Sequence, residues 1–176
     1  MKKILCVCTC LALLVSLSAC GITDMFTYKG AVNNYMSALI GEADEDTFRS
    51  LVPEEAWEYL DDVGYDPDDI VEQYLDSQDD IMDELEDELG DDVKFSYTVD
   101  DEDELSRKEM EELCEYLEHY DVNTDDIKKA YELELYVTLE GDYDDEEDDI
   151  TLIVYQLGYK WYVFESIRLI NLYHGI

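Results

Sequence analysis

The spacing of apolar residues changes from a helical to a strand period near residue 90, and this change limits the fold more than any other feature. Before it, apolar residues recur at intervals of three and four, as in the stripe that ends with Met82, Leu85 and Leu89. After it, Val93 and Phe95 begin an alternation with polar residues that is typical of a strand with one buried face. We therefore expect a chain of the α+β class, with helices first and a sheet second.

Turn and cap residues divide the first part of the chain into four helices. The first is expected over residues 28–40, and a second, short helix follows it. Pro53 fits the first turn of a third helix, because the missing N–H of proline would be unpaired there in any residue. Pro67 begins the longest helix in the same way, and this helix runs to about Leu89, before a glycine stop.

The second part of the chain is expected to form four strands, with a helix after the first. Alternation predicts strands over residues 93–99, 131–139, 150–157 and 160 to about 170, with an acidic loop over 141–149. The capping box of Ser106 and Glu109 predicts the inserted helix, from about residue 107 to 119.

A two-residue hairpin turn at Gly158 and Tyr159 sets the expected pairing of the last two strands. The predicted partners on one face are 157 with 160, 155 with 162, 153 with 164, 151 with 166, and 149 with 168. On the other face they are 156 with 161, 154 with 163, 152 with 165, and 150 with 167. The prediction is one domain over residues 28–176, in which N-terminal helices pack on a curved, mainly four-stranded antiparallel sheet with a helical insertion after the first strand.

The N-terminus has the pattern of a secretory signal. Two lysines precede an apolar run from residue 4 to 17, and small residues lead to Cys20. The ending Leu17-Ser18-Ala19-Cys20 resembles the bacterial lipoprotein signal, which implies removal of residues 1–19 and a lipid on Cys20. Residues 20–27 then form a tether, and the protein lies anchored at the extracytoplasmic face of the bacterial cell membrane. The alternative is a secreted protein that is cut after Ala19 and carries no lipid.

The charge of the chain restricts its partners. Without residues 1–19 the 11 basic residues fall to 9 while all 48 acidic residues stay, so that the net charge becomes −39. Such a surface repels nucleic acid and anionic lipid headgroups, which leaves the lipid anchor as the expected contact with the membrane. The partners that this charge allows are cationic or neutral molecules at the cell envelope and weakly bound divalent cations. The alternative interpretation is that the charge only provides solubility.

Cys114 is the one cysteine that follows Cys20, so the domain has no partner for an internal disulfide. It lies in an apolar stripe with Met110, Leu113 and Leu117, and its neighbours are acidic, which favours a buried cysteine over a reactive one.

Three segments carry a resemblance to a known superfamily: residues 28–39, with the sequence YKGAVNNYMSAL, residues 46–53, and residues 158–163, in which a turn precedes Trp161 and Tyr162. They resemble small secreted domains of the nuclear transport factor 2-like superfamily, especially lipoproteins of Gram-positive bacteria. The resemblance implies a helix-plus-curved-sheet domain. It does not select an activity, because that superfamily holds enzymes, binding modules and structural domains.

One stretch of the sequence has part of the spacing of a calcium loop. Asp121, Asn123, Asp125 and Glu132 occupy positions 1, 3, 5 and 12 of such a loop. Position 6, where the sharp turn requires glycine, holds Asp126. A turn with a helix cap therefore competes with a metal site at these residues.

Catalytic patterns are weak in this sequence, and no cofactor is expected. Neither a nucleophile elbow nor a cysteine–histidine pair is evident. Glu165 and Trp161 are the candidate ligand-binding residues, because the predicted pairing places both on one apolar face, where a carboxylate can anchor a ligand or act as a base. The competing interpretation puts Glu165 at the edge of the sheet.

Three functions remain open from the sequence. The first is a lipid-anchored, non-enzymatic domain that binds a partner or ligand outside the cell. The second is an enzyme or ligand-binding protein that uses Glu165 with tyrosines in a cavity of the sheet. The third is an acidic spacer or cation-buffering surface protein.

Overall fold

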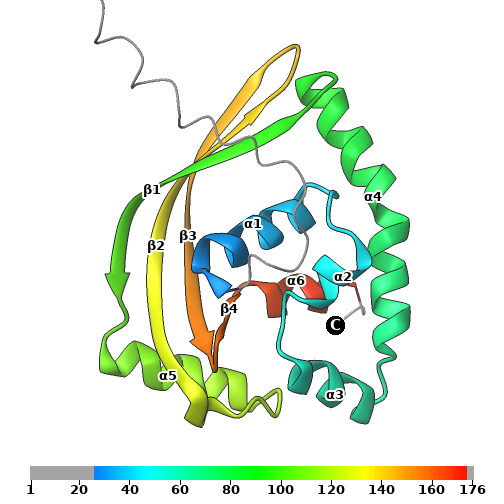
Figure 1. Cartoon of the computed structure of the whole chain (residues 1–176). Helices are drawn as coiled ribbons and strands as arrows, with labels where there is room; N and C mark the ends of the chain where they lie inside the picture. Colours follow the sequence, from blue (N-terminus) through cyan, green and yellow to red (C-terminus); the bar gives the residue numbers. More distant parts are fainter. Residues whose placement is uncertain (1–25, 174–176) are drawn as a thin grey trace, which may run out of the picture.

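The computed structural model describes residues 26–173, and its architecture is α+β (Figure 1). The elements in chain order are α1 (Tyr28–Leu39), α2 (Glu45–Arg49), α3 (Glu54–Asp62), α4 (Pro67–Leu89), β1 (Lys94–Glu104), α5 (Arg107–Glu118), the short 3₁₀ helix η2 (Thr124–Asp126), β2 (Ile127–Glu140), β3 (Asp145–Leu157), β4 (Lys160–Val163) and α6 (Ser166–Leu172). The predicted class, with helices before a four-stranded antiparallel sheet and a helix inserted after its first strand, is confirmed.

The sheet has the strand order β1-β2-β3-β4, and every neighbouring pair is antiparallel. The three long strands curve around α1, which lies along the concave side of the sheet (Figure 1). A bulge between Val99 and Asp101 shifts the register of β1 against β2. Bulges increase local twist, so this irregularity bends the outer strand.

The core lies between α1 and the concave face of the sheet. Alternate residues of β2 and β3 point toward α1 and are buried, and they include Leu133, Leu135, Leu152 and Val154. Their polar neighbours on the same strands point the other way. The period of two in the sequence thus becomes a sheet with one apolar face and one polar face.

A second part of the core joins the remaining helices. The rings of Phe48 in α2 and Tyr74 in α4 stack with centroids 4.0 Å apart, and Tyr173 meets both rings edge-on. Such pairs add stability beyond their buried area. The first half of α4 is therefore fixed against the body of the domain.

Local signals placed the helix ends well. Asp66 caps α4 by accepting a hydrogen bond from the N–H of Asp68, and Ser106 and Glu109 form the predicted capping box of α5. Gly90 follows α4 with a φ of 95°, which explains why a glycine ends this helix.

The prediction of a long last strand was wrong. The turn at Gly158 and the first pairs, from Leu157 with Lys160 to Val154 with Val163, are confirmed. Beyond Val163 the chain leaves the sheet and forms α6, so the predicted pairs that join residues 149–152 with 165–168 do not exist. The buried residues of α6 suit either period over so short a run.

The prediction of an acidic loop over residues 141–149 was also wrong in part. The turn ends at Asp144, and the five acids from Asp145 to Asp149 belong to β3, where they pair with β2. Likewise β1 continues past Val99 through acidic residues to Glu104. Pairing with the central strand overrides the low strand propensity of these acids.

The predicted signal peptide (residues 1–19) and Cys20 lie outside the described residues. Among residues 26–173 the structure contains no helix that is long and apolar enough to cross a membrane. The described chain starts beside the β3–β4 turn, where Phe26 stacks against Tyr159 with ring centroids 5.9 Å apart.

Candidate functional site

The face of the sheet that points away from α1, here called the outer face, carries the most unusual surface of the described domain. From Glu132 of β2 and Thr151 of β3 to the turn that joins these two strands, its side chains are polar and mostly exposed. The pairing of β1, β2 and β3 arranges them in rows across the sheet: Asp103–Glu132–Ile153, Asp101–Glu134–Thr151, Thr98–Tyr136–Asp149 and Ser96–Thr138–Glu147.

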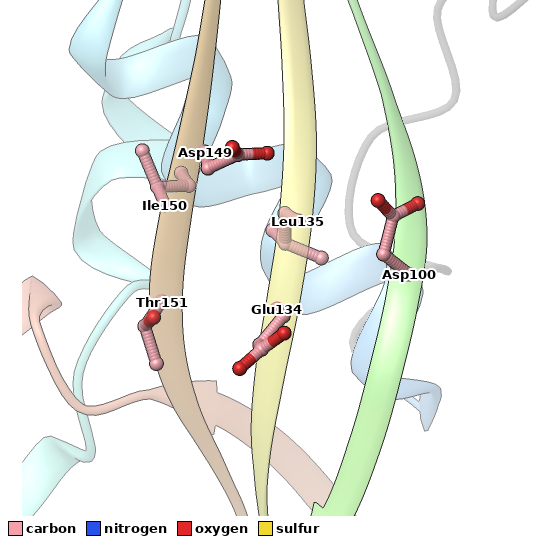
Figure 2. Close-up of a pocket in the computed structure, with 6 residues that line it drawn as sticks. All are labelled: Asp100, Glu134, Leu135, Asp149, Ile150 and Thr151. Carbon is pink, nitrogen blue, oxygen red and sulfur yellow. The ribbon is translucent and has the colours of Figure 1, made fainter.

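An open hollow of about 360 Å³ lies in the middle of the outer face. Figure 2 shows its six lining residues on three neighbouring strands, with the carboxylates of Asp100, Glu134 and Asp149 spread across them. Leu135 and its cross-strand partner Ile150 also line the hollow, although Leu135 is 1% exposed and belongs to the face that points toward α1, and Thr151 supplies a hydroxyl. Each of the three strands thus contributes one acid to a shallow site that is open to solvent.

The bulge in β1 helps to build this hollow. Asp100 is the residue left without a cross-strand partner between Val99 and Asp101. Its carboxylate lies 3.2 Å from the hydroxyl of Thr98, two residues earlier on the strand. The bulge therefore adds one more acid to the outer face than a regular strand could present.

The electrostatics of the outer face are those of unneutralised acids. A hydrogen bond with Glu147 is the largest cause that raises the pKa of Tyr136, and the nearby charges of Asp149 and Asp100 act in the same direction. Ion pairs in the described residues involve Arg49, Arg107 and Lys108, which lie on helices. The carboxylates of the outer face consequently keep their negative potential.

This arrangement suits a cationic or hydrogen-bonding partner more than a single bound ion. Within residues 26–173 no group of three or more acidic, histidine or cysteine side chains is close enough to hold a metal ion. Carboxylates and hydroxyls spread over three strands instead offer separate acceptors to several positive groups.

The four residues of the predicted calcium loop are not gathered into one site. Asp121 lies in the turn after α5 with a φ of 55°, and Asn123 accepts a hydrogen bond from the N–H of Asp125 at the start of η2. Glu132 lies five residues along the extended strand β2, about 16 Å from its first residue. The turn and cap described for this segment account for its sequence.

Glu165 lies at the edge of the sheet, beyond the last residue of β4. Its side chain is half-buried, and one carboxylate oxygen accepts a hydrogen bond from the N–H of Ile153 at 3.2 Å. Burial is the largest cause that raises the pKa of this carboxyl, while the bond from Ile153 and the charge of Arg168 lower it. Glu165 lines neither of the two hollows described, the one on the outer face and a tight one beside α1.

Trp161 is 8% exposed and packs in an aromatic cluster. Its ring stacks on Tyr131 at 5.9 Å and meets Tyr28 edge-on at 5.8 Å. The hydroxyl of Tyr28 in turn donates a hydrogen bond to Glu102, at 2.7 Å. The structure does not bring Trp161 and Glu165 together as a binding pair, because the strand on which they were expected to share a face stops at Val163.

Cys114 is half-buried on α5, and burial raises the pKa of its thiol. A raised pKa disfavours the reactive thiolate, as expected, but the buried residues of α5 are Leu113 and Leu117, so the predicted burial of Cys114 is found only in part.

Sequence reasoning missed the three acids of the hollow. Glu134 lies within the predicted strand 131–139, but Asp100 follows the predicted strand 93–99, and Asp149 was placed at the end of the predicted acidic loop. The alternation of acids with apolar residues along β2 was a usable signal for this site. A side chain on one face of a strand inside a sheet has cross-strand neighbours on both adjacent strands, so the acids of β2 predict further side chains beside them on that face.

Comparison with known proteins adds no relative: no family model, no curated protein and no solved structure matches the chain. The resemblance to the nuclear transport factor 2-like superfamily therefore stays a prediction.

Proposed function

We propose that this protein is a lipid-anchored, extracytoplasmic binding domain without enzymatic activity, and that it holds a cationic partner on the outer face of its sheet. The observation that carries the proposal is the set of cross-strand rows of acids and hydroxyls around the hollow of Asp100, Glu134 and Asp149. The proposed location is the outer side of a bacterial cell membrane, and Cys20 is the proposed lipid attachment site. A domain of the nuclear transport factor 2-like type remains part of this proposal.

The energetics of the sheet support a binding role. Acids have low strand propensity, and like charges on adjacent strands destabilise the pairing of those strands. This sheet nevertheless has Glu132 beside Asp103 and Glu134 beside Asp101 on β1. A partner with positive groups relieves that repulsion when it binds, which converts a folding cost into binding free energy.

An enzyme built on Glu165 has less support. The carboxylate of Glu165 is engaged with the N–H of Ile153, so its described contact is with the sheet itself. A spacer or cation-buffering protein would also have an acidic surface, but it requires no hollow and no difference between the outer face and other acidic surfaces. The binding experiment below separates these functions.

The binding test compares two variants of the full-length protein that lose the same charge. The site variant is Asp100→Asn with Glu134→Gln and Asp149→Asn. The control variant is Asp79→Asn with Asp80→Asn and Asp83→Asn, which are exposed acids of α4. Titration calorimetry with octalysine at low salt should show at least about tenfold weaker binding for the site variant, from the loss of about three charge-assisted contacts. The control should lose much less. Equal losses in the two variants would support a general acidic surface instead.

The anchor is tested separately. Cys20→Ala should release the protein from the membrane fraction of the producing bacterium, because it removes the thiol that would carry the lipid. The intact mass of the native protein should correspond to a chain that starts at a lipidated Cys20. An unmodified cysteine or an uncleaved signal would contradict the anchor while leaving the binding site untouched.

A further inference from the structure

We infer that the free edge of β3 is a strand-addition site, which takes an extended cationic peptide segment as a fifth strand of the sheet. This inference rests on the proposed function and deepens it, since it states the backbone conformation in which the cationic partner binds. The edge adjoins the hollow, because Asp149, Ile150 and Thr151 of β3 line both.

The edge is free because β4 is short. β4 pairs only with residues 154–157 of β3, and in the described sheet β3 has no neighbour other than β2 and β4. The hydrogen bonds of Ile153 with Phe164 and Glu165 close the paired part of the edge. Residues 145–151 of β3 therefore pair with β2 on one side and with no described strand on the other.

The direction of the unpaired backbone groups follows from Ile153. Both its N–H and its carbonyl point to the edge, since the first donates to Glu165 and the second accepts from the N–H of Phe164 at 2.8 Å. Antiparallel pairing alternates this direction along a strand. The N–H and carbonyl groups of Thr151, Asp149 and Glu147 thus point to the free edge of β3, where a seven-residue segment in extended conformation can pair with them.

The other edge of the sheet is less suited to strand addition. β1 carries a bulge between Val99 and Asp101, and bulges twist an edge away from a regular partner. Over residues 145–153 the pairing of β3 with β2 has no such shift. A regular, unpaired edge of this kind is the one that extended peptides join.

Charge selects the class of peptide. Glu147 and Asp149 flank the free edge on the outer face, and Glu146 and Asp148 flank it on the other face. All four side chains are exposed. They repel a second copy of this acidic chain, so the edge is closed to self-association, whereas lysine or arginine side chains on either face of an added strand meet a carboxylate. The carboxylate of Asp148 accepts a hydrogen bond from the N–H of Asp149, and an added strand would replace that bond.

The test uses two peptides of equal charge with the full-length protein. One is an octapeptide of alternating lysine and valine. The other has the same sequence but is N-methylated on every residue, so that it can donate to β3 through neither of its edges. The methylated peptide should bind at least about tenfold more weakly, because about three backbone hydrogen bonds are lost. Binding of the unmethylated peptide should also slow hydrogen exchange at the amides of Glu147 and Thr151, and should leave exchange in α4 unchanged.

The outcomes separate this inference from the proposed function. If both peptides bind equally and the site variant weakens both, the acidic face binds cations without strand addition, and the inference is wrong while the proposed function stands. If exchange at Glu147 and Thr151 is unchanged at saturation, the inference is also wrong. If neither peptide binds, the proposed function itself fails.

Discussion

The carboxylate of Glu165 takes the place of a main-chain acceptor at the point where the β3–β4 pairing ends. It accepts a hydrogen bond from the N–H of Ile153, while the carbonyl of Ile153 accepts a hydrogen bond from the N–H of Phe164. The same residue directly precedes α6, and its φ and ψ of −62° and −18° are already helical. One side chain thus closes the hydrogen bonding of a strand where the backbone turns from the sheet into a helix.

This position predicts a pH effect on stability. Burial raises the folded pKa of Glu165 above its unfolded value of about 4.3, so the native state binds more protons between the two values. The stability that this carboxyl contributes is present below the unfolded pKa and is lost as the pH rises through the folded pKa. In Glu165→Gln that loss is absent, and the variant should gain relative to the native protein as the pH rises above about 4.3.

Denaturant unfolding from acidic to neutral pH measures this difference. Glu84→Gln, at an exposed position of α4, is the matched control and should give a curve parallel to that of the native protein. Parallel curves for Glu165→Gln as well would mean that the Glu165 carboxyl has the same pKa in the folded and unfolded chains.

At the scale of elements, the sequence predicted helix ends and turns correctly where a single residue or a short motif determines the local backbone conformation. Pro67, the box of Ser106 with Glu109, and Gly158 each act locally, and the helix starts and the turn follow from them. The candidate site was less predictable. The acids of β1 and β3 are strand residues because β2 pairs with them. Such pairing between distant segments cannot be recognised from the local sequence, since a run of acidic residues has low strand propensity and no alternation of apolar and polar residues. α6 was missed since seven residues are too few to separate the two periods.

A pair of glycines predicts how tightly α4 meets the β2–β3 turn. Gly90 and Gly64 have similar φ angles, 95° and 100°, so alanine is strained at both. At Gly64 a new Cβ meets nothing within 4 Å, whereas at Gly90 it would lie 2.8 Å from the ring of Tyr143. Gly64→Ala should cost about 1 kcal/mol of unfolding free energy. Gly90→Ala should cost about 2–4 kcal/mol, because overpacking adds to the strain.

Chemical denaturation of both variants measures these costs, and the difference between them reports the contact with Tyr143 together with the backbone strain at Gly90, whose φ of 95° and ψ of −176° are adopted essentially by glycine alone. Equal costs would mean that the turn can move away from α4 without loss. That result would also indicate that the hydrogen bond from the N–H of Tyr143 to the carbonyl of Leu89 at 2.8 Å contributes little.

At the scale of the whole molecule, a well-packed apolar core lies beneath a surface with a large excess of negative charge. Apolar side chains from α1, the concave face of the sheet and the other helices form one continuous cluster. The proposed mature chain has a net charge of −39. Burial must therefore outweigh a mutual repulsion that the few ion pairs of the described helices leave largely in place.

This balance predicts stabilisation by salt. Raising the ionic strength from about 0.01 M to 0.15 M shortens the Debye length from about 30 Å to about 8 Å. The melting temperature should therefore rise over this range, and calorimetry or circular dichroism measures it. Calcium and magnesium chloride should act alike at equal ionic strength, because the described residues hold no metal cluster. A larger effect of calcium than of magnesium would support a calcium site at Asp121, Asn123, Asp125 and Glu132.

The stack of Phe26 on Tyr159 has a consequence for how the protein stands on a bilayer. It places the start of the described chain at the β3–β4 turn, and six residues of tether let the proposed lipid on Cys20 lie within about 20 Å of it. β3 begins at the opposite end of the sheet from this turn, and its thirteen residues put Asp145 about 40 Å from the turn. Electrostatic potential decays within about 8 Å at physiological salt. The acidic row nearest to this turn is Asp103–Glu132–Ile153, five residues from Gly158, whereas the free edge of residues 145–151 lies farther along β3 and farther from the proposed lipid.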